Sequence, residues 1–232
     1  MMRRYLSILM ILMMGALSAC SNTTAQPDDT QPQEPAETEA VPAENEDIHV
    51  LVAYFTYAEN ADLPEDVDAS TSASIQPGDT LTGNTGLVAV MIADELGADL
   101  FSIQTQERYP DTYDETIAQG QQEQQEGARP ALRSQVEDMD SYDVIFLGYP
   151  NWWGDMPMAV YSFLDEYDLS GKQVIPFVTS GGSGFSNTVA AIAQLEPQQA
   201  QIIEGLALSD SEAPQAQARV QEWLGTLELS AG

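Results

Sequence analysis

The sequence predicts an α/β fold in which a doubly wound, five-stranded parallel sheet carries helices on both faces. Three apolar runs, at 48–55, 144–149 and 174–178, contain almost no polar residue. Such runs are typical of strands that are buried on both faces, as in parallel sheets. Segments with the apolar spacing of helices lie between them, and this alternation favours a parallel sheet covered by helices on both sides.

The predicted elements alternate from residue 48 to residue 227. Strands are expected at 48–55, 100–103, 144–149, 174–178 and 202–208. Helices are expected at 87–96, 114–125, 156–167, 187–195 and 220–227. Gly97 is a suitable stop for the first helix. Pro176 lacks a ladder donor, so a bulge or a strand start is expected there.

Residues 1–20 are predicted to be a lipoprotein signal peptide. Arg3 and Arg4 precede an apolar stretch at 5–16, which is too short for a stable membrane anchor. The stretch leads to Leu17-Ser18-Ala19-Cys20, and small residues before a cysteine resemble the bacterial lipobox. We therefore expect lipidation at Cys20 and an extracytoplasmic protein anchored to the cell membrane. An ordinary secretory signal and export by the twin-arginine route stay open as alternatives.

Residues 21–47 are predicted to be a disordered acidic linker, because the segment has no basic residue and almost no large apolar one. The domain is then 48–232. The chain has a formal net charge of −30, and loss of Arg3 and Arg4 with the signal leaves −32. Such a charge repels nucleic acid and anionic lipid, so the membrane is expected as a partner only through the lipid anchor.

Three loops follow the buried strands and are expected at one edge of the sheet. The first contains Thr56 and ends in Thr82-Gly83-Asn84-Thr85 before a helix. Hydroxyls and a helix N-terminus together can hold a phosphate without lysine or arginine. The same four residues also make a good helix cap, so this signal is weak by itself.

The second loop, 149–155, places Trp152 and Trp153 side by side after a buried strand. Two tryptophans in a polar loop predict that a flat aromatic group covers at least one of them, unless both rings pack into the core. The third loop, 179–184, is rich in glycine, which lets backbone approach a ligand closely. A flexible turn is the alternative for this loop.

Together the three loops resemble those of the flavodoxin family over about 48–208. The matching segments are 50–56, 82–85, 146–157 and 176–184, of which 146–157 is the most specific. The resemblance implies a flavodoxin-like fold with non-covalently bound FMN where the strand order reverses. The cofactor-binding residues it implies are Thr56, Gly83, Asn84, Thr85, Pro150, Asn151, Trp152, Trp153, Gly154, Ser180, Gly181 and Gly182.

By position in the resembled motif, Trp153 is expected to stack on the flavin ring. Backbone groups of 151–154 and 180–182 are expected to bind the polar edge of the ring. Asp155, Glu59 and the negative charge of the chain would disfavour a reduced, anionic flavin, which predicts a low reduction potential.

The sequence departs from the family at 57–81, a Ser-, Thr- and Asp-rich insertion without a basic residue that splits the phosphate loop. Its ends are expected to be ordered and its middle disordered, although a lid over the flavin is also possible. Glu59 is expected near the phosphate position. Either its side chain points away from the phosphate, or the affinity for phosphate is reduced.

The favoured function is a membrane-tethered FMN electron-transfer protein that serves a redox protein partner or a small electron acceptor. An FMN-dependent NAD(P)H/quinone-type oxidoreductase is the alternative, although no Gly-x-Gly-x-x-Gly fingerprint is present. A binding module that has lost its cofactor is the second alternative. No catalytic side chain and no metal site is predicted, because the single histidine, His49, lies at the far end of the first strand.

Overall fold

The computed structural model describes residues 48–63, 73–75, 81–196 and 200–230. All of them belong to one unit of the chain, residues 44–232. The signal peptide, Cys20 and the acidic linker lie outside the described residues. Within the described residues, no helix is both long enough and apolar enough to cross a membrane.

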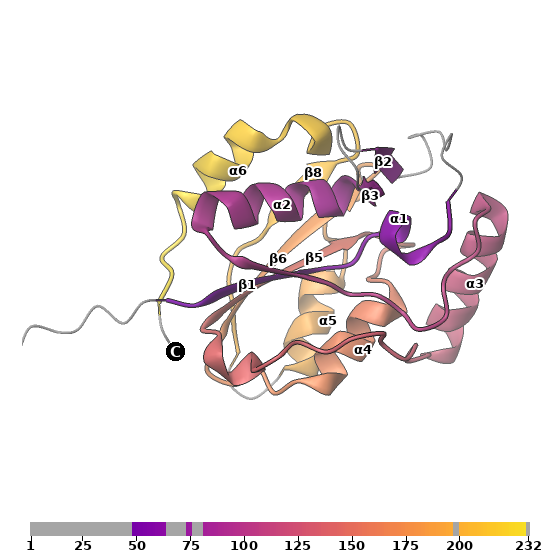
Figure 1. The fold of residues 1–232 in the computed structure, drawn as a ribbon, viewed down its shortest axis with the longest axis horizontal. Coiled ribbons are helices and arrows are strands. Elements are labelled where there is room, and N and C mark those ends of the chain that lie inside the picture. The colour runs from indigo at the N-terminus through magenta and orange to yellow at the C-terminus, as the bar shows by residue number, and fades with distance from the viewer. Residues whose placement is uncertain (1–47, 64–72, 76–80, 197–199, 231–232) are drawn as a thin grey trace, which may run out of the picture. The chain divides into compact units, whose positions relative to one another are not determined.

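The main sheet is parallel, and its strand order confirms the doubly wound α/β fold (Figure 1). The chain enters at a central strand, adds one neighbour on one side and then continues on the other side. The order of the sheet reverses at β1, which is where open α/β sheets bind their ligands. From edge to edge the strands are β4 (Asp99–Ser102), β1 (Val50–Tyr54), β5 (Val144–Pro150), β6 (Gln173–Ser180), and then β7 (Gln201–Ile202) with β8 (Leu206–Ser209).

The predicted fifth strand is broken into β7 and β8, and both pair with β6. Ile203 donates its N–H to the carbonyl of Val174, so the backbone of Pro176, two residues further on, faces the same edge. Because Pro176 has no N–H to donate towards that edge, the hydrogen-bond ladder is interrupted there. Between β7 and β8 the edge strand therefore has one residue more than the facing part of β6. The expected bulge is therefore in the neighbouring strand at 203–205, and β6 itself continues through Pro176.

The backbone of Gly205 lies against this interruption. A Cβ atom at Gly205 would come within 2.1 Å of the Pro176 carbonyl oxygen, so only glycine fits without a shift.

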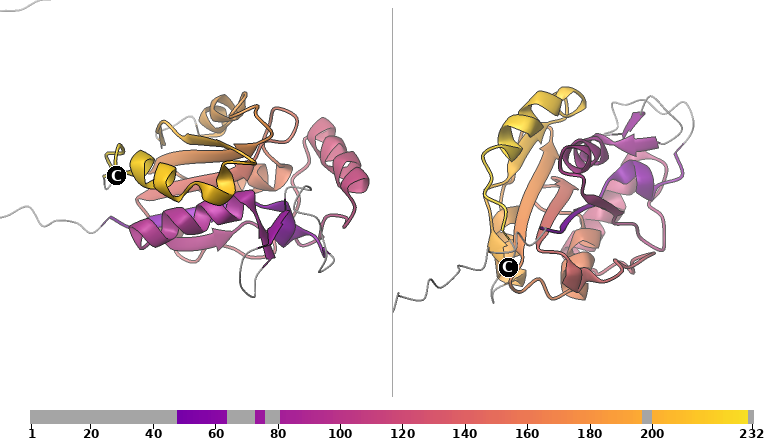
Figure 2. Two further views of the ribbon diagram at one scale, coloured as in Figure 1. Left: turned by 90° about the horizontal axis from the view of Figure 1, so that it is seen from above. Right: turned by 60° about the vertical axis from the view of Figure 1, so that its left-hand side comes forward.

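Helices cover both faces of the sheet (Figures 1 and 2). Alternate residues of β1 serve the two cores: Leu51 and Ala53 face one, and Val52 faces the other. One face is covered by α2 (Asn84–Leu96) and α6 (Gln217–Leu224), and the other by α4 (Met158–Glu166) and α5 (Thr188–Leu195). Two short 3-10 helices are η2 (Met139–Ser141) and η3 (Ala213–Gln215).

Two helices have boundaries that differ from prediction by three residues. Helix α2 begins at Asn84, three residues earlier than its apolar spacing indicates, because its first turn is polar. Helix α6 begins and ends three residues earlier than predicted and is followed by Gly225. Trp223 in α6 packs edge-on against Phe146 in the core, with ring centroids 5.7 Å apart.

The ends of the 57–81 insertion are ordered. It opens with a short helix, α1 (Tyr57–Asn60), and closes with β3 (Leu81–Gly83), which pairs antiparallel with β2 (Ala73–Ile75). Residues 64–72 and 76–80 lie outside the described residues, so the expected disorder of the middle stays a prediction there. The end of the insertion leads through β3 directly into α2.

Helix α3 (Tyr113–Glu126) lies beyond the carboxyl end of β1, beside α1 (Figure 1). Asp114 and Glu115 stand in its first turn, where negative charge favours a helix start. The helix ends at Gly127 in the left-handed conformation, at φ 60°. Its position next to the carboxyl edge of the sheet makes α3 a wall of the site described next.

Candidate functional site

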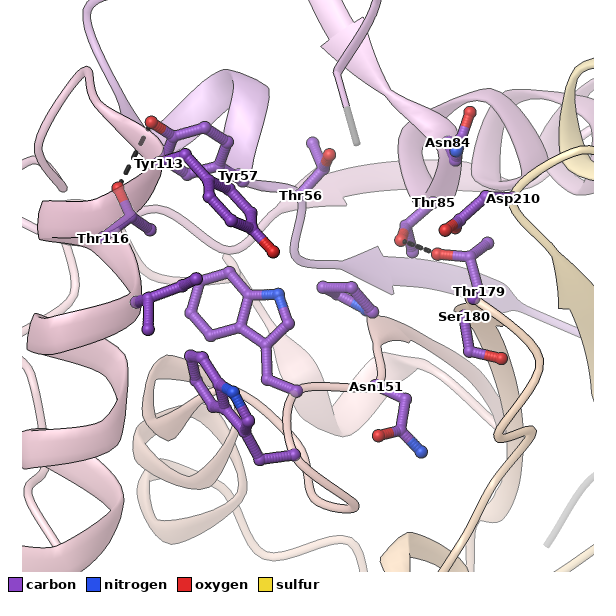
Figure 3. A pocket seen from close by; sticks show the side chains of 15 residues that line it. Thr56, Tyr57, Asn84, Thr85, Tyr113, Thr116, Asn151, Thr179, Ser180 and Asp210 are labelled. Atoms are coloured by element: carbon purple, nitrogen blue, oxygen red, sulfur yellow. Dashed lines mark hydrogen bonds between the residues drawn. The ribbon is translucent and has the colours of Figure 1, made fainter. Parts of the chain in front are cut away.

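A cleft of about 200 Å³ opens at the carboxyl ends of β1, β5 and β6 (Figure 3). One side, here called the hydroxyl side, is formed by the end of β1, the start of α2, the end of β6 and the segment after β8. The other side, here called the aromatic side, is formed by α1, α3 and the loop after β5. The hydroxyl side contains Thr56, Asn84, Thr85, Thr179, Ser180, Gly181 and Asp210; the aromatic side contains Tyr57, Tyr113, Thr116, Ile117, Pro150, Asn151, Trp152 and Trp153.

The hydroxyl side is built around the N-terminus of α2. Gly83 stands at the N-cap and has no side chain to occupy the N–H groups of the first turn. Thr85 in that turn shares a hydrogen bond with Thr179 of β6, with their hydroxyl oxygens 2.8 Å apart. These groups suit an anion, because a helix N-terminus and hydroxyls both supply hydrogen-bond donors.

The charge at the cleft is low and negative. Among the described residues that line it, none is a lysine or an arginine, and Asp210 is the one acidic residue. Neither Asp155 nor Glu59 lines the cleft, whereas Asp210, which the sequence did not single out, does. No group of three or more potential metal-ligating residues occurs in the part of the chain that the structure describes.

The aromatic side is fixed by packing of Trp152 on the core. Its ring meets Phe55 edge-on at 5.5 Å between centroids and Tyr109 edge-on at 5.7 Å. Such edge-to-face pairs are worth about 1 kcal/mol each beyond the area they bury. Burial, reinforced by the carboxylate of Glu123, raises the pKa of Tyr109 well above its usual range, so its hydroxyl stays a donor to that carboxylate.

Trp153 differs from Trp152 because it is 44% exposed. The two rings are tilted by 58° with centroids 5.8 Å apart. The two tryptophans therefore do not both pack into the core, and the Trp153 ring leaves apolar surface beside the cleft.

Helix α3 leaves space for the Trp153 ring at Gly120. A Cβ atom at this position would lie 2.9 Å from Cζ3 and 3.1 Å from Cη2 of Trp153. Glycine in the middle of a helix is unfavourable by about 1 kcal/mol relative to alanine. Its presence in a Gln- and Glu-rich helix is explained by this close approach.

The loop after β5 is a tight turn held by its own residues. Trp152 and Asp155 exchange backbone hydrogen bonds of 2.8 and 3.0 Å, and Gly154 donates its N–H to the side chain of Asn151. Trp153 and Gly154 both have positive φ, of 51° and 84°. The strain of a left-handed tryptophan is of the kind that functional sites carry.

Side chains tie this turn to its surroundings. The carboxylate of Asp155 accepts hydrogen bonds from the N–H of Met156 and from the Tyr161 hydroxyl, at 2.8 and 2.7 Å. Asn151 donates its side-chain amide to the carbonyl of Gly184 in the loop after β6, at 2.7 Å. Asp155 thus shapes the turn, which explains why it does not face the cleft.

The loop after β6 is organised by Ser180. Its hydroxyl oxygen accepts hydrogen bonds from the N–H groups of Gly182 and Gly184, at 3.3 and 3.0 Å. Gly182 is at φ 119°, which an L side chain rarely adopts. The loop is therefore a defined turn held by a side chain.

Most of the residues predicted for the site come together at the cleft. Nine line it: Thr56, Asn84, Thr85, Pro150, Asn151, Trp152, Trp153, Ser180 and Gly181. Three glycines, Gly83, Gly154 and Gly182, do not line it and instead form the N-cap and the two turns. Sequence reasoning missed Tyr57, Tyr113, Thr116, Ile117, Thr179 and Asp210. Thr179 had a signal, since it directly follows a predicted strand and opens the third loop, whereas the residues of α3 are far away in sequence.

Comparison with protein families matches residues 79–227 to the family described as flavodoxin. Among solved structures, a candidate flavoprotein from Bacteroides eggerthii is 26% identical with a TM-score of 0.58, covering 79% of this chain and 100% of that one. One from Bacteroides uniformis is 24% identical with a TM-score of 0.58, covering 77% and 99%. A flavoprotein from Lactobacillus acidophilus, solved in complex with FMN, is 19% identical with a TM-score of 0.53, covering 73% and 98%. No curated protein matches.

The structural matches share the parallel sheet and its helices with this chain. The family match covers more than half of the chain and begins close to the end of the insertion, so it includes α2 and the loops after β5 and β6. With the reversal of strand order at β1 and the cleft at that edge, these findings show that the chain belongs to the flavodoxin family.

Proposed function

We propose that the cleft binds FMN non-covalently and that the protein uses it to transfer electrons. The observation that carries this proposal is that one cleft joins a hydroxyl-rich helix N-terminus to a pair of tryptophans. FMN combines the two matching chemistries, a phosphate and a flat aromatic ring. The FMN in the Lactobacillus acidophilus flavoprotein and the membership in the flavodoxin family support the same assignment.

The hydroxyl side would hold the phosphate. Thr56, Asn84 and Thr85 line this side, and the first turn of α2 adds backbone N–H groups and the positive end of its dipole. With no lysine or arginine there among the described residues, attraction would come from short-range hydrogen bonds. We therefore expect flavin affinity to depend only weakly on salt.

The aromatic side would hold the ring. Trp153 is the better candidate for stacking, because its exposed face is available whereas Trp152 is engaged with the core. Backbone groups of 151–154 and 180–182 are proposed to bind the polar edge of the ring. The hydrogen bond from Asn151 to Gly184 holds these two loops together.

Bound FMN supplies the redox chemistry, and the protein sets the environment in which it occurs. Asp210 lines the cleft and the net charge is −30, so negative charge that develops on a ligand would be disfavoured. We expect a low reduction potential for this reason. The same charge would steer the protein towards basic redox partners, with association rates that fall as salt rises.

We also propose that the protein works outside the cytoplasm, tethered by a lipid on Cys20. The proposal rests on the lipobox-like Leu17-Ser18-Ala19-Cys20 that follows the apolar stretch. The Cys20→Ala variant should move from the membrane fraction to the soluble fraction. An unchanged membrane fraction, or an unmodified Cys20 by mass spectrometry, would refute the tether.

The absorption spectrum tests FMN binding. Purified protein is incubated with FMN and freed of unbound flavin, and retained flavin bands at about one flavin per chain are expected. Protein that emerges free of flavin would overturn the proposal and favour a binding module without cofactor.

Carrier and oxidoreductase are separated by a turnover assay. Loaded protein is mixed with NAD(P)H and a soluble quinone. A carrier should show negligible turnover while it still exchanges electrons with a chemically reduced dye. Rapid saturable oxidation of NAD(P)H would instead favour the oxidoreductase.

A further inference from the structure

The hydroxyl side is assembled from two segments that the insertion separates. Thr56 precedes residues 57–81, and Asn84 and Thr85 follow them, yet all three line the same cleft. Closing a loop of this length costs conformational entropy that grows with the logarithm of its length. Contacts at the two ends of the insertion must therefore hold the segments together.

One of these contacts is a half-buried carboxylate in α1. Glu59 accepts hydrogen bonds from the hydroxyls of Thr82 at 2.5 Å, Ser102 at 2.5 Å and Tyr54 at 3.1 Å. These donors stand in β3, β4 and β1, so a single side chain joins four elements. Hydrogen bonds to a charged acceptor are about twice as strong as neutral ones.

The Glu59 cluster lies directly against the first turn of α2. A Cβ atom at Gly86 would come within 2.0 Å of the Thr82 hydroxyl oxygen and 3.2 Å of Oε1 of Glu59. Gly86 shares this turn with Thr85. A negative charge beside a helix N-terminus is also favourable for the helix. Any displacement of Glu59 or Thr82 would therefore be transmitted to the anion-binding turn.

The residue after Glu59 holds the other segment. Asn60 is buried and donates its side-chain amide to the carbonyl of Thr56 and to that of Ile103, both at 3.0 Å. Its side-chain oxygen accepts the N–H of Thr105 at 2.9 Å. Two adjacent residues of α1 thus contact the chain on both sides of the insertion. Asn60 is hydrogen-bonded to Thr56 before it, and Glu59 is hydrogen-bonded to Thr82 after it.

The carboxylate of Glu59 is satisfied by hydroxyls. Among the described residues Glu59 forms no ion pair, and its side chain does not line the cleft. Burial, with the neighbouring charge of Glu59, raises the pKa of Tyr54 well above its usual range, so this donor stays protonated. The side chain of Glu59 is therefore directed to these three hydroxyls and not into the cleft.

We propose that Glu59 is a positioning residue that holds the two parts of the split phosphate loop together from outside the cleft. The inference rests on the proposed function, since it assigns Glu59 to the half of the cleft that would take the FMN phosphate. It holds Thr82 and the first turn of α2 against Thr56. Its effect should be confined to ligands that carry a phosphate, because the tryptophans are held by other contacts.

The test compares FMN with riboflavin, which lacks the phosphate, in the unmodified protein and in variants. Glu59→Ala is expected to weaken FMN binding by about tenfold or more, with riboflavin changed less than about threefold. Glu59→Gln keeps one acceptor oxygen and is expected to retain a large part of the FMN affinity that Glu59→Ala loses. Glu137→Ala removes an equal charge from an exposed residue that does not line the cleft, and is expected to have no effect.

Two results would overturn the assignment: an FMN affinity of Glu59→Ala equal to that of Glu137→Ala, or equal losses for FMN and riboflavin. Thermal unfolding of each variant shows whether it is folded at the assay temperature. Should the unmodified protein bind neither flavin, the proposed function fails, and hydrogen exchange then decides about Glu59. Faster exchange at residues 82–86 in Glu59→Ala than in Glu59→Gln supports the positioning role, and equal exchange refutes it.

Discussion

The two sides of the cleft are built by different means. On the aromatic side both tryptophans come from one continuous turn, 151–155, and are held by packing and by hydrogen bonds within the turn. The hydroxyl side combines Thr56 with the start of α2 across an insertion, and polar contacts of Glu59 and Asn60 hold it. Packing within a short motif survives an insertion elsewhere, whereas a split loop needs new contacts of its own.

The largest effect should separate the two tryptophans of the aromatic side. Trp152→Ala removes the edge contacts with Phe55 and Tyr109 and is expected to cost about 3 kcal/mol of unfolding free energy. Trp153→Ala removes an exposed ring and is expected to cost under about 1 kcal/mol. Denaturant unfolding measures both. Equal losses would show that the two rings are not held in different ways.

Alkaline pH should destabilise both sides together. Burial raises the pKa of Tyr54 on the hydroxyl side and of Tyr109 on the aromatic side above the unfolded value of 10.0. A tyrosine whose pKa is raised in the folded state contributes stability that is present below the unfolded pKa and is lost as pH rises towards the folded one. The denaturant midpoint should fall steadily above about pH 10. A midpoint that stays constant to pH 11 would contradict this burial.

Gly120→Ala tests the contact between α3 and the aromatic side. Alanine favours the helix by up to about 1 kcal/mol, but its Cβ would meet the Trp153 ring at 2.9 Å. We expect little net change in stability, together with altered tryptophan emission and weaker flavin binding. The control is Gln121→Ala at an exposed position of the same helix. If the two variants bind flavin alike, the close approach at Gly120 is unimportant for the site.

The smallest effect should come from the one carboxylate of the hydroxyl side. Asp210→Asn removes a negative charge at the cleft and should raise the reduction potential of bound flavin, on the order of tens of millivolts. Glu137→Gln removes an exposed charge that does not line the cleft, so it should leave the potential nearly unchanged. Spectroelectrochemical titration of both loaded variants makes the comparison. A shift of equal size in both would assign the effect to net charge alone.

The sequence predicted the features that depend on local pattern. The continuous apolar runs gave the strands, and the residues between 149 and 157 gave the aromatic turn. Tyr113 and Ile117 could not be predicted, because α3 reaches the cleft through tertiary packing that its polar sequence does not indicate. Asp210 was missed for a similar reason, since it follows a strand whose end was not expected beside the cleft.

The sequence predicted a bulge at Pro176, but the bulge lies in the neighbouring edge strand and not in β6 itself. A missing N–H disturbs the strand that would accept it, and that strand is the edge at 203–205. Glu59 offers a related lesson. Its place in the sequence, just after Thr56, predicted a position near the phosphate, and the three hydroxyl donors from other elements that hold its carboxylate could not be read from the sequence.

The central claim is that both sides of the cleft serve one ligand, and it is tested most directly by fluorescence titration of FMN and riboflavin into the unmodified protein. We predict saturable quenching by the aromatic side for both flavins, with FMN bound at least about tenfold more tightly because of the hydroxyl side. Equal affinities would show that the hydroxyl side does not take the phosphate. No quenching of either flavin up to about 50 µM would contradict the assignment of the cleft to a flavin.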